Sequence, residues 1–186
     1  MPMASSRAAE IFISNKALTQ SVEQALFTDD GRWFLENSGP CNRAYLQSPM
    51  ITTADGRLQL RARLRARKAI VYQGRCIGPA FDSIVLLSGA LVISQDTMSL
   101  EQLRVDSIED DATRLAYTVA MQADLVRLPQ AVRFAFRPAL DAALAQLPGW
   151  RIRADSLNLS LLGTDRQGVR LGIDFSLVVD ELPAQR

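Results

Sequence analysis

Histidine is absent from this sequence of 186 residues, and its absence excludes several kinds of site. Without imidazole the chain has no histidine-based catalytic triad and no histidine-ligated zinc. It also lacks the one side chain whose unperturbed pKa lies near neutrality. Carboxylate and thiolate chemistry stay open, but we expect a protein that is not an enzyme and that needs neither a cofactor nor a metal.

Cysteine is scarce as well, since only Cys41 and Cys76 occur, in the loop-like segments GPCN and GRCIGP. Two thiols are too few for the usual four-ligand zinc site. A cysteine nucleophile would also need a base, and histidine is not available for that task. In an exported protein the two residues could form one disulfide, whereas in a cytosolic protein they would be free thiols. We favour the disulfide.

Long apolar runs are missing too, because no stretch reaches the roughly 18 residues that a membrane-spanning helix needs. The first residues, MPMASSRAAE, lack the apolar segment of a signal peptide, and residues 1–9 are expected to form a loose leader. The protein is therefore either cytoplasmic, or the chain begins at or near a processed or engineered start.

Lysine is rare: Lys16 and Lys68 are the only lysines among 21 basic residues, so the other 19 are arginines. Guanidinium groups bind carboxylates and phosphates in a two-pronged fashion, which could favour anionic partners. A codon bias towards arginine is the simpler explanation. The formal net charge is only +1, and 48% of the residues are hydrophobic. This composition is typical of a globular protein and argues against a cationic nucleic-acid-binding tail.

The first third of the chain predicts a strand, a helix and a loop. Residues 10–14 (EIFIS) alternate as in a strand. Asn15 is a plausible N-cap for a helix over 16–27, in which apolar residues recur at three- and four-residue spacing. Residues 34–49 contain Gly and Pro and show little periodicity, so we expect a loop there, with a short strand at 44–47.

The clearest pattern follows an Asp-Gly turn. From residue 57, the segment RLQLRARLRARKAI places an apolar residue at every second position and arginine or glutamine between them. A period of two over ten residues predicts a half-buried strand in an antiparallel sheet with one wet face. Further strands are expected at 84–94, with a bend or bulge at Gly89, at 100–108 and at 115–125.

The last third predicts a long helix and a closing hairpin. Residues 129–147 show a helical apolar stripe, and Pro138 predicts a kink or two abutting helices. Two alternating segments at 157–161 and 169–179 then predict strands joined at 164–168. A run of strands with segregated helices is typical of the α+β class. We expect one such domain over residues 10–182, with the helices on one face of an antiparallel sheet.

The arginines of the strand at 57–67 are the most visible polar feature, and Arg61, Arg63 and Arg65 are candidates for weak anion binding. Side chains at alternate positions could contact phosphates or an anionic membrane surface. The alternative is a solvated face whose arginines pair with acids of other strands, and the low net charge favours it. Such acids are Glu101, Asp106 and Asp174. Nucleic acid is not expected as a partner, because no aromatic residue is interleaved with these arginines.

Two pairs of adjacent carboxylates are candidates for acid–base or metal chemistry. These are Asp29 with Asp30 and Asp110 with Asp111. Both pairs stand beside turn-like residues, where adjacent acids are usually solvated, and their spacing matches no calcium loop. We expect neither pair to be a site.

The order of elements resembles a known family. It is seen in EIFISNKALTQSVEQAL, GALVISQDTMSLEQLRVDSIE, VRFAFRPALDAALAQL and GVRLGIDFSLVV. This pattern is similar to that of the bacterial YceB-like lipoproteins, whose domain resembles the tubular lipid-binding (TULIP) proteins. The resemblance implies a strongly curved antiparallel sheet wrapped around a long helix of the C-terminal half, with an N-terminal helix and an apolar groove. It also implies lipid handling at the cell envelope. The sequence departs from the family in having no lipoprotein signal and no N-terminal lipidated cysteine.

We therefore predict non-catalytic binding of a lipid or other apolar ligand in a groove between sheet and helices, in the periplasm or at the envelope, with a cytoplasmic location as the alternative. The competing hypothesis is a structural or interaction module that holds a protein partner by a sheet edge or by the arginine face. A membrane surface is a further possible partner. The residues expected to line the groove are Leu18, Val22, Leu26, Val119, Met121, Val132, Phe136, Leu140, Leu144, Leu171 and Ile173.

Overall fold

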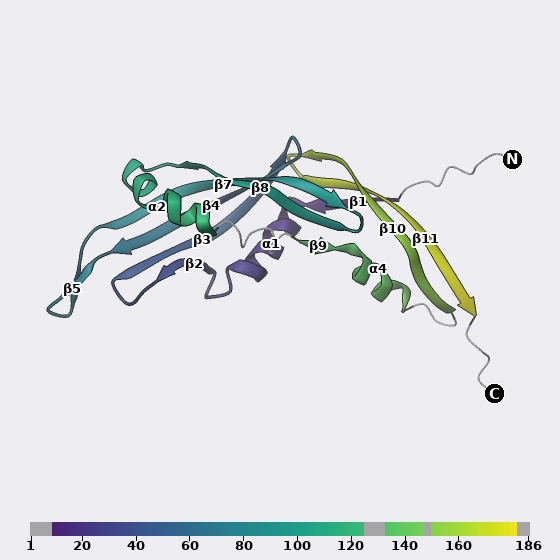
Figure 1. Cartoon of the computed structure of the whole chain (residues 1–186), viewed down its shortest axis with the longest axis horizontal. Coiled ribbons are helices and arrows are strands. Elements are labelled where there is room, and N and C mark those ends of the chain that lie inside the picture. Colours follow the sequence, from purple (N-terminus) through teal and green to yellow (C-terminus); the bar gives the residue numbers. More distant parts are fainter. Residues whose placement is uncertain (1–8, 125–132, 147–149, 182–186) are drawn as a thin grey trace, which may run out of the picture.

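Antiparallel strands make up most of the structure, a computed structural model that describes residues 9–124, 133–146 and 150–181 (Figure 1). The strands are β1 (Ala9–Ser14), β2 (Arg32–Asn37), β3 (Asn42–Ala54), β4 (Arg57–Lys68), β5 (Ile70–Tyr72), β6 (Arg75–Ile77), β7 (Ala80–Ser94), β8 (Thr97–Ile108), β9 (Phe134–Ala135), β10 (Trp150–Asp165) and β11 (Gly168–Glu181). The helices are α1 (Asn15–Leu26), α2 (Asp111–Asp124) and α4 (Phe136–Leu144).

The strands form a strongly curled arch. A six-stranded sheet has the order β2-β3-β4-β7-β8-β9, a three-stranded sheet the order β1-β11-β10, and β5 pairs with β6 alone. Figure 1 shows the six-stranded sheet in one half of an elongated molecule and β10 and β11 in the other, with α1 and α4 beneath the arch. The expected α+β class with a strongly curved antiparallel sheet is confirmed at this level.

Strand β4 is confirmed as a strand with one wet face. Leu58, Leu60 and Leu64 are at most 1% exposed, whereas Arg61 and Arg63 are exposed. The neighbouring strands β3 and β7 pair with β4 along almost its whole length. Because alternate side chains of a strand point to opposite faces, the leucines enter the main core and the arginines reach solvent.

The start of α1 differs in detail from the prediction. Ser14, and not Asn15, is the N-cap, and its hydroxyl accepts a hydrogen bond from the Ala17 N–H at 3.2 Å. Asn15 has a long-range role instead. Its Nδ2 donates to the Arg166 carbonyl at 3.0 Å, and its Oδ1 accepts from the Thr53 hydroxyl at 2.8 Å. Either residue could serve as a cap, and the tertiary contacts of Asn15 decide between them.

Turns of the six-stranded sheet form hydrogen bonds with strand β10 of the three-stranded sheet. The Gly56 N–H donates to the Thr164 hydroxyl at 2.7 Å, and the Leu159 N–H donates to the Gln95 carbonyl at 2.8 Å. Leu171 of β11 belongs to the main core cluster, most of whose members lie in the six-stranded sheet, α1 and α2. The closing hairpin of β10 and β11 is confirmed, and it shares the main core with the larger sheet.

The bend predicted at Gly89 is confirmed. The pairing of β7 with β8 shifts register between Ser88 and Ala90. A Cβ atom at Gly89 would lie 2.7 Å from the Leu103 Cδ2 atom, closer than real Cβ contacts come. Glycine therefore allows the two strands to approach at this bulge.

The loop expected over residues 34–49 is wrong, because β2 and β3 occupy most of this segment. Pro49 lies in β3 where its pairing with β4 shifts register, next to Ser48 with φ of 53°. Proline has no N–H to donate, but a bulge tolerates it. Gly39 and Pro40 lie in the short connection between the two strands.

The strand expected over 115–125 is also wrong, because these residues belong largely to α2. Leu115 is 90% exposed, which is incompatible with its predicted place in an apolar strand face. Thr113, Tyr117 and Met121 are buried at four-residue spacing. The alternation of apolar residues in this segment coincided with a helical stripe, and burial follows the stripe.

The long helix expected over 129–147 is not shown. Residues 129–132 and 147 lie outside the described residues. In the described part the chain first forms β9, which pairs with β8, and only then α4, which has nine residues. Pro138 stands in the first turn of α4, where its missing N–H removes no intrahelical hydrogen bond. The proline therefore fits the start of a short helix and does not kink a long one.

Candidate functional site

The α1 residues expected to line a groove belong to the hydrophobic core instead. Leu18 and Val22 are completely buried, and Leu26 is 8% exposed. All three pack in the main hydrophobic cluster against side chains of the six-stranded sheet. This side of α1 holds the fold together and leaves no opening at these three residues.

Five further predicted residues either belong to the core or have side chains outside the described part of the structure. Met121 and Leu171 are 1% and 0% exposed and belong to the main cluster. Val119 lies in α2 and Leu144 in α4, but their side chains are outside the described part, as is the whole of Val132. The structure thus places two more of the expected residues in the core.

Phe136, Leu140 and Ile173 are brought together in a separate apolar cluster under α4. Buried Leu157 and Leu159 of β10 complete its centre. The start of α4 is fixed by hydrogen bonds, since the Phe136 N–H donates to the Asp96 carbonyl at 2.9 Å. We use the name α4 groove for the apolar face of the β10–β11 hairpin that lies beside α4.

The floor of the α4 groove continues beyond its buried centre. The register of the hairpin places Leu157 opposite Phe175 and Leu159 opposite Ile173, so these four side chains share one face. Phe175 and, further along β11, Leu177 are 39% and 40% exposed.

Their exposure has a structural cause. Among the described residues, β1 pairs with β11 only as far as Ile173, so β11 has no strand on that side at Phe175 or Leu177. The apolar face of the hairpin therefore runs from buried side chains at Leu157 and Ile173 to exposed ones at Phe175 and Leu177.

The arginine face of β4 is partly neutralised. Asp82 of β7 forms two hydrogen bonds with Arg63, at 2.6 and 2.7 Å, and lies 3.5 Å from the Arg65 Nε atom. The hydrogen bond from Arg63 holds the pKa of the Asp82 carboxyl below its usual value. Arg61 is exposed and belongs to none of the ion pairs found among the described residues. Arg63 thus pairs with Asp82, an acid that is not among those expected from the sequence.

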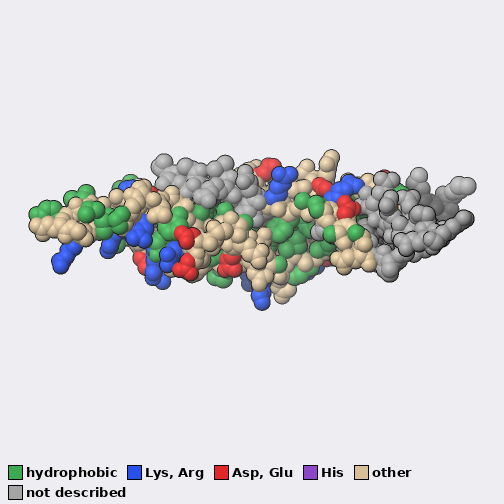
Figure 2. All heavy atoms as spheres, turned by 90° about the horizontal axis from the view of Figure 1, so that it is seen from below, with side chains coloured by type: hydrophobic (Ala, Val, Ile, Leu, Met, Phe, Trp, Pro, Cys, Tyr) green, Lys and Arg blue, Asp and Glu red, His purple; other side chains and the backbone are tan. Residues whose placement is uncertain are grey.

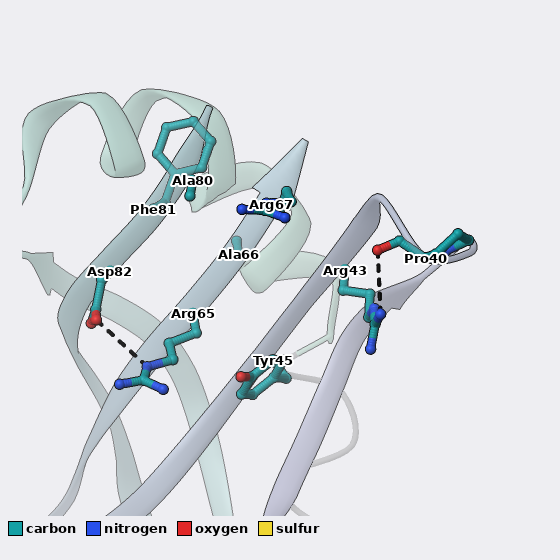
Figure 3. Close-up of a pocket in the computed structure, with 9 residues that line it drawn as sticks. All are labelled: Pro40, Arg43, Tyr45, Arg65, Ala66, Arg67, Ala80, Phe81 and Asp82. Atoms are coloured by element: carbon teal, nitrogen blue, oxygen red, sulfur yellow. Dashed lines mark hydrogen bonds and ion pairs between the residues drawn. The ribbon is translucent and has the colours of Figure 1, made fainter. Parts of the chain in front are cut away.

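A hollow of ≈ 370 Å³ lies at one end of this face (Figure 3). Its walls include Arg43, Arg65, Arg67, Tyr45 and Asp82. The neighbouring strand β3 thus brings an aromatic ring beside the arginines, although β4 itself has none. We call these residues the arginine hollow, and their charges suit a small anionic group.

Cys41 and Cys76 are joined in a disulfide, with their Cα atoms 5.3 Å apart. Cys41 is 3% exposed and follows β2, whereas Cys76 lies in β6. The bond therefore ties the β5–β6 hairpin to the end of the six-stranded sheet, beside the arginine hollow.

The carboxylate pairs have structural roles where the structure defines them. The Asp110 carboxylate accepts hydrogen bonds from the Thr113 N–H and hydroxyl, both at 2.6 Å, which caps α2. Asp111 pairs with Arg114 at 2.7 Å, and Asp30 lies 3.5 Å from Arg32.

Within the described residues, no three or more Cys, Asp or Glu side chains cluster in a way that could bind a metal ion. Nor does any helix in this part of the chain combine the length and apolar character needed to cross a membrane.

Two groove residues escaped sequence reasoning. Phe175 and Leu177 were assigned to an apolar strand face but not to the site, because a strand pattern does not say where a neighbouring strand or helix stops covering it. No family model matches the sequence, and no curated protein matches it either.

Proposed function

We propose that this protein binds a lipid or another apolar ligand without catalysis, in the α4 groove. The observation that supports this most is the continuation of the buried apolar floor at Leu157 and Ile173 into the exposed side chains of Phe175 and Leu177. A face that served only as core would be covered along its length. An acyl chain laid along this face would cover Phe175 and Leu177 as α4 covers Leu157.

The energy of such an interaction is adequate. Each buried methylene group contributes about 0.8 kcal/mol, so about ten of them would contribute roughly 8 kcal/mol before the cost of association. A micromolar dissociation constant corresponds to about 8 kcal/mol at 25 °C. Micromolar binding therefore requires most of a medium-length acyl chain to be buried, with further contacts offsetting the association cost.

Relationship to the YceB-like lipoproteins and the tubular lipid-binding proteins is part of this proposal. The curled antiparallel sheet agrees with the architecture that the resemblance implies, although the helix against β10 has only nine residues. A location in the periplasm or at the envelope is supported by the disulfide between Cys41 and Cys76, since such bonds persist in oxidising compartments.

Native mass spectrometry of the purified protein, before and after extraction with organic solvent, tests the proposal. We expect a bound mass that extraction removes. Phe136→Arg places a charge in the groove and should abolish retention of the bound ligand. Leu115→Arg, at a position 90% exposed on α2, should leave that retention unchanged. If circular dichroism shows that Phe136→Arg does not fold, Leu177→Arg replaces it, because Leu177 is 40% exposed.

A protein that is free of small molecules and takes up no fatty acid or phospholipid when these are added would contradict the proposal. Specific capture of a protein partner by such a ligand-free chain would instead favour an interaction module.

A further inference from the structure

The β5–β6 hairpin forms the end of the molecule remote from α4 and carries largely exposed apolar side chains (Figure 1). Ile70, Val71, Tyr72 and Ile77 are 70%, 63%, 57% and 55% exposed. None of the four belongs to either hydrophobic core cluster. Large apolar side chains that gather on one element without contributing to the core mark an interaction surface.

The hairpin has an amphipathic face. Its register pairs Ile70 with Ile77 and Tyr72 with Arg75, so these four side chains share one face, while Val71 lies on the other face opposite Cys76. The shared face is apolar near the base and has a tyrosine and an arginine next to the turn. Side chains of this kind have an apolar body and a polar tip, which suits a boundary between water and lipid.

The surroundings of the hairpin are basic. The sequence has no Asp or Glu from residue 37 to 54 or from 56 to 81, the segments that form the hairpin and the strands next to it. Arg43, Arg67 and Arg75 take part in no ion pair among the described residues. In Figure 2, Lys and Arg side chains lie beside the hydrophobic ones at this end. The excess of cations complements an anionic surface.

The arginine hollow adjoins the same hairpin. Pro40 and Ala80 line it, and these residues lie next to Cys41 and at the start of β7, where the chain leaves the hairpin. Arg43, which donates a hydrogen bond to the Pro40 carbonyl at 3.3 Å, and Arg67 therefore lie near the base of the hairpin. Asp82, the carboxylate of the hollow, is already paired with Arg63.

The hairpin is held in a fixed position. The Lys68 N–H donates to the Pro79 carbonyl at 3.1 Å and closes its base, and the disulfide of Cys76 ties β6 to the body. Its turn uses Gln73 and Gly74 with φ of 48° and 73°, the conformation of tight hairpins. A preformed apolar tip has little ordering entropy to lose when it binds.

We infer that the β5–β6 hairpin docks the protein on an anionic lipid bilayer. Its apolar face enters the headgroup region, and Arg43, Arg67 and Arg75 contact lipid phosphates. A purely apolar protein partner would not require the arginines without an ion pair around the hairpin. The positive charge of these arginines therefore favours an anionic bilayer. This inference goes beyond the proposed function, because the hairpin and the α4 groove lie at different ends of the arch (Figure 1).

Co-sedimentation with vesicles tests the docking. One set of vesicles contains phosphatidylcholine and phosphatidylglycerol in equal parts, and the other contains phosphatidylcholine alone. We expect the protein to sediment with the anionic set, to bind the neutral set much more weakly, and to be released as the salt concentration rises. A protein that stays in the supernatant with anionic vesicles at low salt would overturn the inference.

Substitutions locate the contact. Ile70→Ser together with Ile77→Ser should weaken partitioning by at least about tenfold, since two large apolar side chains are lost from the interface. Arg67→Gln and Arg75→Gln should each weaken it about fivefold. Leu115→Ser is the control, because it removes an apolar side chain from α2 that is even more exposed, at 90%, and it should leave partitioning unchanged. Phe136→Arg should also leave partitioning unchanged, which separates this inference from the groove proposal.

A fluorescent probe gives a readout that does not depend on the loss of binding. In Tyr72→Trp the added emission should shift to shorter wavelength with anionic vesicles and be quenched by brominated lipid, whereas in Leu115→Trp it should not. Absence of both changes in a vesicle-bound Tyr72→Trp protein would overturn the inference. Sedimentation velocity without lipid tests for a second copy: a dimer that the double serine variant dissociates would assign the hairpin to self-association and overturn the bilayer.

Discussion

Leu157 and Phe175 lie directly opposite each other on one face of the β10–β11 hairpin, yet Leu157 is 6% exposed and Phe175 is 39% exposed. The cover over this face therefore ends between them. Leu157 contributes to the stability of the fold, and Phe175 is partly exposed to solvent, as the proposed ligand site requires.

This difference predicts unequal costs of truncation. Leu157→Ala should lower the free energy of unfolding by about 2–4 kcal/mol, because it leaves a cavity in the buried cluster. Phe175→Ala should cost about 1–2 kcal/mol in the ligand-free protein and so less than Leu157→Ala, since Phe175 is 39% exposed already. Urea denaturation of the delipidated variants measures both values, and equal losses would show that Phe175 is core.

The Tyr117 hydroxyl provides a second test. It is buried and has no hydrogen-bond partner among the described residues, although its ring packs edge-on against Phe81 with centroids 5.4 Å apart. Burial raises the pKa of this phenol. Tyr117→Phe should raise the free energy of unfolding by up to about 1 kcal/mol, because an unpaired buried hydroxyl is costly. A loss of stability in thermal melts would reveal an unseen partner for the hydroxyl.

The disulfide should contribute substantially to stability. Cys41 and Cys76 are separated by 35 residues, and closing a loop of that length lowers the entropy of the unfolded chain. Replacing both residues by serine should lower the free energy of unfolding by roughly 4 kcal/mol on the chain-entropy model. Urea denaturation of the oxidised wild type and of the variant makes the comparison, and matching midpoints would contradict a formed bond.

The cap of α2 should make its stability depend on pH. Hydrogen bonds from the Thr113 hydroxyl and N–H lower the pKa of Asp110. The cap is therefore fully effective above the pKa of an unfolded aspartate, about 3.9, and is lost as the pH falls through the lower folded value. Asp110→Ala should lower the melting temperature at neutral pH and remove this part of the acid dependence, whereas Asp110→Asn should retain most of the cap. Identical acid profiles for wild type and Asp110→Ala would argue against the cap.

The sequence allowed the elements with one dominant period to be predicted. Alternation over ten residues predicted β4, and an apolar stripe predicted the helix α1. The segment of α2 fits both periods at once. Tyr117 and Met121 are four residues apart, a spacing that puts two side chains on the same face of a strand and also on the same face of a helix. The sequence predicts a solvated carboxylate at Asp110, whereas in the structure this carboxylate caps the helix.

The site was less predictable than the fold, because coverage depends on contacts between distant segments. Leu18 lies on the apolar stripe of a helix and Ile173 on the apolar face of a strand, yet Leu18 is closed in by the six-stranded sheet and Ile173 borders exposed side chains. The pairing of Asp82 with Arg63 likewise depends on β7 lying beside β4. Periodicity identifies which face of an element is apolar, but only the packing of other elements determines whether that face is left open.

Nuclear magnetic resonance of methyl- and aromatic-labelled protein with dodecanoate tests the central claim most directly. If the ligand lies in the α4 groove, nuclear Overhauser contacts will join its methylene protons to the ring of Phe175 and the methyl groups of Leu177 and Leu140. Saturating dodecanoate that gives no contact to these three side chains, or contacts only Ile70 and Ile77 of the hairpin, would contradict a ligand site in the groove.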